Sequence, residues 1–252
     1  QCETPVLTDV PSYVYEATRI KDLDSAASLV EQLFPDFKIV TMEATEDNWS
    51  FWFKDKEGKS IRIRCDGHVR MKTSSPLVYA DPSREYNLES LERKARDYAR
   101  LHGVQSDLYL ISIGQMVEEG ITVEGKTGPC FIFGRLVDGV PLFGDQIRVW
   151  FNIDEEIVEF AFKETKIRRV NGTTPIRPVE ECLITARRQI VEMGKGEVSK
   201  RVTNVRIGYY LKEGKLVACW WITTKSKGPG SAKTLIVDAT SGDFVKVVNR
   251  YH

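Results

Sequence analysis

The stretch CFIFGRLVDGVPLFGDQIRVWFNIDEEIVE, residues 130–159, carries the strongest structural signal in the chain. Residues 130–137 are rich in strand-forming side chains, and the Asp138-Gly139 pair that follows is typical of the two-residue turn of a β-hairpin. Gly144-Asp145 predicts a second break. In residues 147–152 every second side chain is apolar, which is the pattern of a strand with one buried face. The stretch therefore predicts an antiparallel meander whose inner face is covered by a helix.

Three predicted helices begin at clear sequence signals. Asp22 and Asn87 stand at N-cap positions before residues with helical apolar spacing, and Pro178 stands at a first helical position. Each helix is followed by short strands that are separated by turns containing glycine. The order of one helix and then several strands occurs three times. It predicts an α+β fold of tandem units, each with one helix packed on an antiparallel sheet. The predicted units are residues 12–80, 84–168 and 173–252.

The segments between these elements give finer predictions. Residues 37–45 are predicted to form a strand. Residues 118–129 are rich in glycine and charge and are predicted to form a solvated loop. Residues 171–175 contain Gly and Pro and are predicted to connect the second unit to the third.

The composition excludes some classes of function. Of the 252 residues, 42% are hydrophobic and 29% are charged, which is typical of a folded globular protein, and equal numbers of Lys+Arg and Asp+Glu give no net charge. Because phosphate affinity normally needs an excess of basic residues, no nucleic-acid partner is expected. No apolar run approaches the roughly 20 residues that span a bilayer. Membrane attachment is then expected only through a removed N-terminal segment or through a lipid on Cys2, whose alternative is a free thiol.

No arrangement typical of a metal, cofactor or catalytic site is present. The five cysteines and three histidines are scattered, with no CxxC or HxxxH pair, so no metal site is expected. The string GITVEGKT, residues 120–127, fits a P-loop, yet Gly128-Pro129 prevents the helix that a P-loop requires. Paired carboxylates are explained by turns or by a helix N-terminus. We therefore predict no catalytic residue and no cofactor, and an uncharacterised enzyme remains an alternative class.

The last predicted unit resembles a PepSY-type domain. The resemblance rests on PVEECLITARRQI, VRIGYYL, VACWWITT and TLIVDATSGDFV, which give an amphipathic helix, a strand with a Gly-Tyr pair, a Trp-bearing strand and a final hairpin. In the central unit, VDGVPLFGDQIRVWF is similar to the strand pattern of the extracytoplasmic regulators YycH and YycI. The resemblance covers roughly residues 84–252, and the first unit shares only the plan.

This resemblance implies a non-catalytic regulatory or binding protein that acts by protein contact outside the cytoplasm, in the cell envelope or secreted. The likeness to YycH and YycI implies a membrane sensor histidine kinase as the partner. PepSY-like units also occur in propeptides of secreted metallopeptidases, which implies the alternative of an inhibitor or chaperone of a secreted peptidase. The motifs are structural, so the resemblance transfers no catalytic residue.

Tryptophan side chains are the candidate partner-binding residues. Trp220 and Trp221 are adjacent in one predicted strand, so their indoles point to opposite faces, as do the side chains of Trp150 and Phe151. Only one member of each pair can face its own helix. The other is expected either to pack between neighbouring units or to contribute to an apolar patch that receives a partner. An exposed sheet edge would also allow a peptide to bind by strand addition.

Overall fold

The structure is a computed structural model of the chain. It describes residues 8–47, 49–73, 85–114, 128–163, 165–192, 198–226 and 231–251. Contacts between residues group the chain into two compact units. The first unit comprises residues 1–16, 138–144 and 167–252, and the second comprises residues 17–137 and 145–166.

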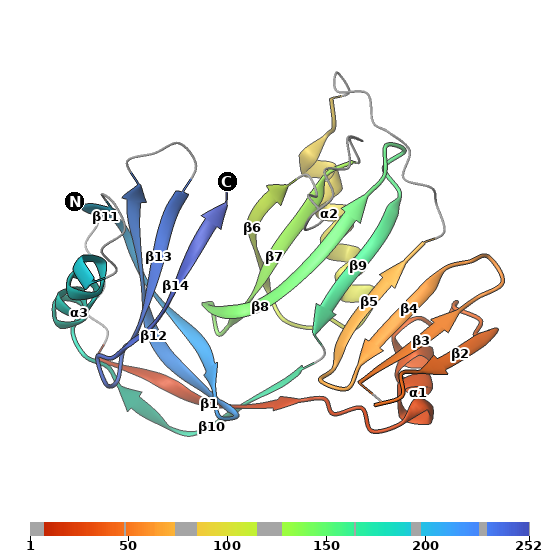
Figure 1. Ribbon diagram of the computed structural model, residues 1–252, viewed down its shortest axis with the longest axis horizontal. Helices are drawn as coiled ribbons and strands as arrows, with labels where there is room; N and C mark the ends of the chain where they lie inside the picture. Colours follow the sequence, from red (N-terminus) through yellow and green to blue (C-terminus); the bar gives the residue numbers. More distant parts are fainter. Residues whose placement is uncertain are drawn as a thin grey trace. The chain divides into compact units, whose positions relative to one another are not determined.

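The second unit is a sheet with two helices on one side (Figure 1). Its strand order is β2-β3-β4-β5-β9-β8-β7-β6. Neighbouring strands are antiparallel wherever their register is described. β8 begins in the first unit and ends in the second. The elements are α1 (Leu23–Leu33), β2 (Thr41–Ala44), β3 (Ser50–Lys54), β4 (Ser60–Arg64), β5 (His68–Lys72), α2 (Leu88–Leu101), β6 (Leu108–Gly114), β7 (Cys130–Val137), β8 (Val140–Phe151) and β9 (Ile157–Lys163).

Side-chain alternation decides which face of this sheet is buried. In β3, Phe51 and Phe53 are fully buried, whereas Trp52 between them is 40% exposed. β4 and β5 show the same alternation of buried and partly exposed positions. The buried side chains pack in one hydrophobic cluster with Val30 of α1 and Ala95 of α2. One core therefore serves both helices.

His102 links the two helices inside this core. Its Nδ1 donates a hydrogen bond of 2.6 Å to the carbonyl oxygen of Leu33, the last residue of α1. The imidazole ring stacks on Phe34 at a centroid distance of 4.6 Å and lies 4.2 Å from the ring of Tyr98. Burial lowers the pKa of His102 below its ordinary value, so the neutral ring is the form that suits the fold.

The first unit contains the other sheet, which α3 covers on one side (Figure 1). β12 pairs with β11 and β13 in antiparallel register, while the short pairing of β11 with the first part of β8 is parallel. The elements are β1 (Asp9–Ala17), β10 (Thr165–Pro175), α3 (Val179–Glu192), β11 (Val198–Lys212), β12 (Lys215–Ser226), β13 (Ser231–Asp238) and β14 (Phe244–Tyr251). The predicted α+β fold class is confirmed.

The predicted helix caps and hairpin turn are confirmed. The side chain of Asp22 accepts a hydrogen bond of 2.8 Å from the backbone N–H of Ser25. Asn87 accepts one of 3.1 Å from Ser90 in the same way, so each caps the first turn of its helix. Asp138-Gly139 joins β7 to β8 with φ values of 48° and 78°, the left-handed pair that a tight hairpin needs.

Three finer predictions were wrong. Gly144 does not break β8, because this glycine adopts a φ of 85° within a continuous strand. Residues 171–175 belong to β10, with Gly172 at φ 106°, rather than to a connector. The strand predicted for residues 37–45 is shorter and runs only over β2.

The three predicted units, residues 12–80, 84–168 and 173–252, each contain one helix followed by strands. Packing groups the described residues differently, since α1 and α2 share one core in the second unit. The boundaries of a threefold sequence repeat stay a prediction. Of the loop predicted at residues 118–129, only residues 128–129 lie within the described part of the chain.

Candidate binding face

The face of the second unit opposite α1 and α2 is lined by charged side chains. Since alternate residues of a strand point to opposite faces, the partners of the buried row lie together on this outer side. Register places Trp52 beside Arg62, Arg62 beside Arg70, Arg70 beside Ala161 and Ala161 beside Arg148. We call this surface the basic face and define it by Glu43, Trp52, Lys54, Arg62, Arg64, His68, Arg70, Lys72, Arg148, Glu159 and Lys163.

Positive charge is concentrated on the basic face. It holds seven Lys and Arg side chains but only two carboxylates, Glu43 and Glu159, although the whole chain has no net charge. A third carboxylate, Asp66, lies in the turn between β4 and β5. The excess is therefore local, and it would attract an acidic partner over a distance of about a Debye length, roughly 8 Å at physiological salt.

Glu159 shows how the basic face holds a carboxylate. Nε and Nη2 of Arg70 donate to its two oxygens at 2.8 and 2.9 Å, a bidentate arrangement. Nζ of Lys72 lies 3.6 Å from the second oxygen. The Glu159 side chain is 11% exposed, so two cations compensate for its partial loss of water.

Asp66 is held in a similar way at the other end of the basic face. Nη2 of Arg64 lies 3.2 Å from Oδ2 of Asp66, and Nζ of Lys163 lies 3.7 Å from the same oxygen. His68 lies on β5 between Arg64 and Lys163. Its pKa is lowered mainly by burial and next by the neighbouring guanidinium of Arg64. The imidazole is therefore neutral at pH 7, and the charge of the face comes from its Lys and Arg side chains.

Two exposed indoles lie beside these cations. The guanidinium carbon of Arg62 is 4.9 Å from the ring centre of Trp52, and that of Arg64 is 4.8 Å from the ring centre of Trp49. Trp52 is 40% exposed and Trp49 is 45% exposed. Each pair is a cation–π contact, so the arginine is oriented while one part of the indole remains accessible.

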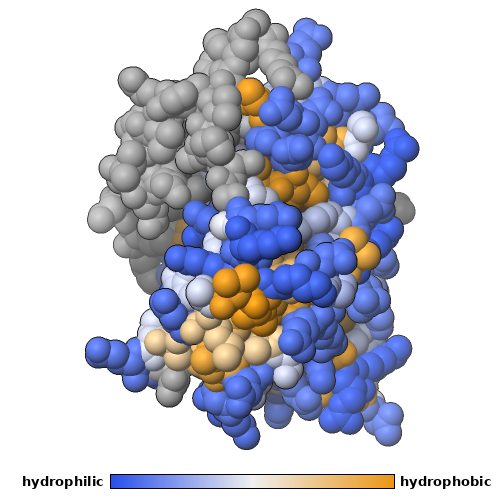
Figure 2. All heavy atoms as spheres, turned by 90° about the vertical axis from the view of Figure 1, so that its right-hand side faces the viewer, coloured by the Kyte–Doolittle hydropathy of each residue, from blue (hydrophilic) through white to orange (hydrophobic). Residues whose placement is uncertain are grey.

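Apolar side chains are also exposed near the β2 edge. Val40 is 61% exposed and Met42 is 50% exposed. Figure 2, which views the molecule from the side of β2, shows an orange and tan hydrophobic area in the lower middle that hydrophilic residues surround. The second unit therefore exposes apolar side chains near the β2 edge in addition to the charges of the basic face.

The predicted anchors Trp150, Trp220 and Trp221 are buried, with 6%, 3% and 5% exposure. Nε1 of Trp150 donates to the carbonyl oxygen of Gly128 at 3.1 Å, and Nε1 of Trp221 lies 3.0 Å from Sγ of Cys219. Their role in partner binding stays a prediction. The indoles that reach the surface are those of Trp49 and Trp52, which were not among the predicted anchors.

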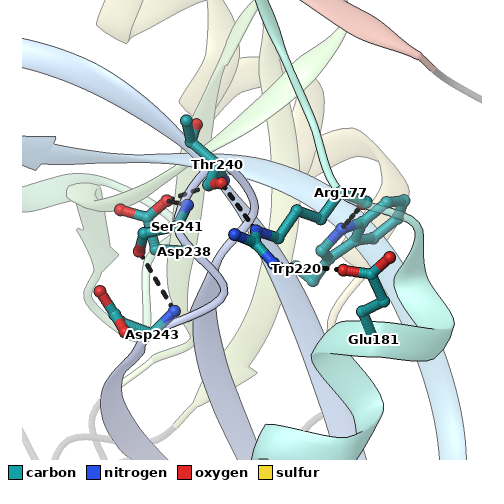
Figure 3. A network of polar contacts seen from close by, with 7 residues as sticks. All are labelled: Arg177, Glu181, Trp220, Asp238, Thr240, Ser241 and Asp243. Carbon is teal, nitrogen blue, oxygen red and sulfur yellow. Dashed lines mark hydrogen bonds and ion pairs between the residues drawn. The ribbon is translucent and has the colours of Figure 1, made fainter.

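Trp220 belongs to a polar network that ties α3 to the turn between β13 and β14 (Figure 3). Its Nε1 donates to the carbonyl oxygen of Arg177 at 3.1 Å, and Nε of Arg177 donates to the carbonyl oxygen of Thr240 at 3.1 Å. Oδ1 of Asp238 accepts the backbone N–H groups of Thr240 and Ser241 at 2.8 and 3.0 Å. The network closes the DATSGD turn of the PepSY-like hairpin and has a structural role.

The sequence carried a signal for the basic face. In SIRIRCDGHVRMK, residues 60–72, arginine or lysine recurs at every second position within each strand, which places these cations on one face. Net charge alone conceals this pattern. Arg148 and Lys163 join the face only because β5 pairs with β9 and β9 with β8, and these pairings are not evident from local sequence.

A small cavity of about 180 Å³ lies within the second unit. Its lining includes Arg135 and Lys163, whose charges are engaged by Asp145 at 3.0 Å and by Asp66 at 3.7 Å. The lining also contains Lys166, an exposed cation for which the described residues provide no acidic partner.

The remaining predictions about sites concern absences. Among the described residues, no three His, Cys, Asp or Glu side chains form a group that could hold a metal ion. No helix within the described ranges is long and apolar enough to cross a membrane. Cys2 and the P-loop-like residues 120–127 lie outside the described residues. The predictions of no metal, no cofactor and no catalytic residue stay predictions.

Comparison with solved structures supports the predicted PepSY-like fold. The chain is similar to the C-terminal domain of YpeB from Bacillus megaterium, with a TM-score of 0.50 and 14% sequence identity, over 93% of this chain and 100% of that one. The YpmB protein from Bacillus subtilis gives a TM-score of 0.21 with 14% identity, over 66% of this chain and 100% of that one, too low to support an argument. Neither neighbour supports YycH or YycI specifically. No family model and no curated protein matches the chain.

Proposed function

We propose that this chain is a non-catalytic regulatory or binding protein that works outside the cytoplasmic membrane and contacts a protein partner through the basic face. The observation that carries the proposal is the local excess of cations on a sheet face that neither helix covers. Like the basic face, interfaces are enriched in arginine and tryptophan, and charge complementarity sets the rate and specificity of association.

The PepSY-like fold supports an extracytoplasmic role because PepSY-like neighbours are typically found there. Two partners follow from the sequence resemblance. The likeness to YycH and YycI favours the sensor region of a membrane histidine kinase, and the likeness to propeptides favours a secreted peptidase that the chain inhibits or assists. Attachment through a removed N-terminal segment or a lipid on Cys2 would keep the chain near a membrane partner.

Site-specific photocrosslinking in intact cells tests this proposal. A benzoylphenylalanine at Lys54 places the probe on the basic face, and the same probe at Arg93 on α2 is the control on the opposite side, where the Arg93 side chain is 73% exposed. We expect one protein to crosslink at Lys54 and not at Arg93. Mass spectrometry identifies it, and binding must then be reproduced with the two purified proteins.

The identity of the crosslinked protein separates the two partners, since a sensor kinase supports the first and a peptidase supports the second. Equal crosslinking from both positions, or no crosslink from Lys54, contradicts the proposed use of the basic face. Turnover of a substrate by the purified chain, lost on a single substitution, would instead support the enzyme alternative.

A further inference from the structure

We infer that the basic face recognises an extended acidic polypeptide segment, whose carboxylates bind Arg62 and Arg148. This inference rests on the proposed function and adds the chemistry of the partner. It starts from the cations that the fold leaves unpaired. Arg70, Lys72, Arg64 and Lys163 already hold Glu159 or Asp66, as described above.

Arg62 has no acidic partner among the described residues. Its Nη2 has only a long hydrogen bond of 3.4 Å to Oγ of Ser50, and its Nε is a buried atom with no hydrogen-bond partner in the described structure. Trp52 supports the guanidinium from one side. An arginine that is already oriented by an aromatic ring loses less side-chain freedom on binding, which favours it as a receptor for a carboxylate.

Arg148 is the second receptor. It is exposed, and its Nη2 lies 3.4 Å from Oε1 of Gln146, with no carboxylate partner among the described residues. Lys54, at the β3 end of the face, is likewise exposed and has no described acidic partner. In the order of the strands, the unpaired cations therefore lie on β3, β4 and β8, and the cations that hold Glu159 lie on β5 between them.

Strand register gives the spacing of the two receptors. Arg62, Arg70, Ala161 and Arg148 occupy one row on four neighbouring strands. Three strand spacings of about 4.8 Å separate the outer two backbones by roughly 14 Å. An extended chain advances about 3.4 Å per residue, so acidic side chains four residues apart match this distance and point to the same side.

The internal contacts favour carboxylate over phosphate as the bound group. The basic face already takes one carboxylate in a bidentate arrangement with Arg70, so its arginines suit carboxylate groups. Ala161, which is 6% exposed, lies in the row between Arg70 and Arg148, so the carboxylate contacts of a crossing segment fall on the arginines to either side. An acidic polypeptide is thus the occupant that we assign.

Fluorescence anisotropy with labelled poly-L-glutamate of about 20 residues tests the inference on the full chain, in 50 mM and 150 mM salt. The double variant R62E/R148E reverses the two receptors. The control R93E/R100E makes an equal change of charge on α2, where both arginines are exposed. We expect the first variant to weaken binding at least tenfold at 50 mM salt and the control to change it by less than threefold, with wild-type affinity falling as salt rises.

The neutral variant R62Q/R148Q keeps the test valid if charge reversal disturbs folding, and its affinity should lie between wild type and R62E/R148E. Circular dichroism checks that each variant is folded. Equal weakening by the control would mean that net charge, not the basic face, binds the probe, and would overturn the inference. Binding of inorganic polyphosphate without binding of poly-L-glutamate would also overturn it, in favour of a phosphate polymer. A protein that crosslinks at Lys54 and binds R62E/R148E normally would support the proposed function and contradict the inference about Arg62 and Arg148.

Discussion

Replacing Asp145 by alanine removes one half of a buried ion pair in the second unit. Oδ2 of Asp145 accepts from Nη1 of Arg135 at 3.0 Å, and the two side chains are 6% and 11% exposed. Removing one partner of a buried pair costs about 3–5 kcal/mol because the other charge remains away from water. Oγ of Ser106 still lies 3.0 and 2.8 Å from the guanidinium, so we expect the lower end, about 3 kcal/mol.

Urea unfolding followed by tryptophan fluorescence and far-UV circular dichroism measures this loss. The matched control is Asp97→Ala, which breaks a pair with Arg100 at 3.9 Å whose side chains are 66% and 64% exposed, and it should cost less than about 1 kcal/mol. The double variant R135M/D145L should lie within about 1 kcal/mol of wild type, since an apolar pair leaves no unpaired charge. A cost for Asp145→Ala no larger than that of the control would refute the argument, because the pair would then be solvated.

Three further predictions concern buried groups. Gly208→Ala places a Cβ 2.4 Å from Nε1 of Trp221, so near-UV circular dichroism should change and stability should fall by about 1–3 kcal/mol. The pKa of His102 is lowered by burial, so below about pH 6.5 the unfolded chain binds a proton that the folded chain resists. Stability should therefore fall between pH 7.5 and 5.5 in urea titrations, and by less in His102→Gln. Burial raises the pKa of Cys182 to about 11, so mass-spectrometric mapping at pH 8 should show slower alkylation there than at the partly exposed Cys65.

Local rules predicted much of the secondary structure. Helix starts followed from Asp22 and Asn87 because an N-cap side chain satisfies backbone N–H groups within one turn, which is a short-range interaction. The Asp138-Gly139 turn followed for the same reason, since only a few residues tolerate two positive φ values in sequence. Strand lengths were predicted less well, because a glycine with positive φ can lie inside a strand, as Gly144 does.

Long-range packing was not available from the sequence. The alternation of Trp52 with Phe51 and Phe53 predicts two faces but not which one the helices cover. The union of α1 and α2 over one core, and the burial of Trp150, depend on contacts between distant segments. In the basic face, too, some residues follow from local sequence and others only from long-range strand pairing. Its central arginines follow a local period of two, whereas Arg148 joins them only through strand pairing.

The interleaving of the two units has a consequence for synthesis on the ribosome. The second unit is complete once residue 166 has emerged, whereas both neighbours of β1, β10 and β12, end later, with Tyr13 paired to Leu216. β1 thus precedes this partner by about 200 residues, and closing so long a loop delays the contact. We expect the nascent chain to hold β1 as an unpaired edge while the second unit folds. A ribosome-stalled fragment that exposes the chain only as far as residue 166 should therefore contain a protease-resistant second unit and a cleavable β1.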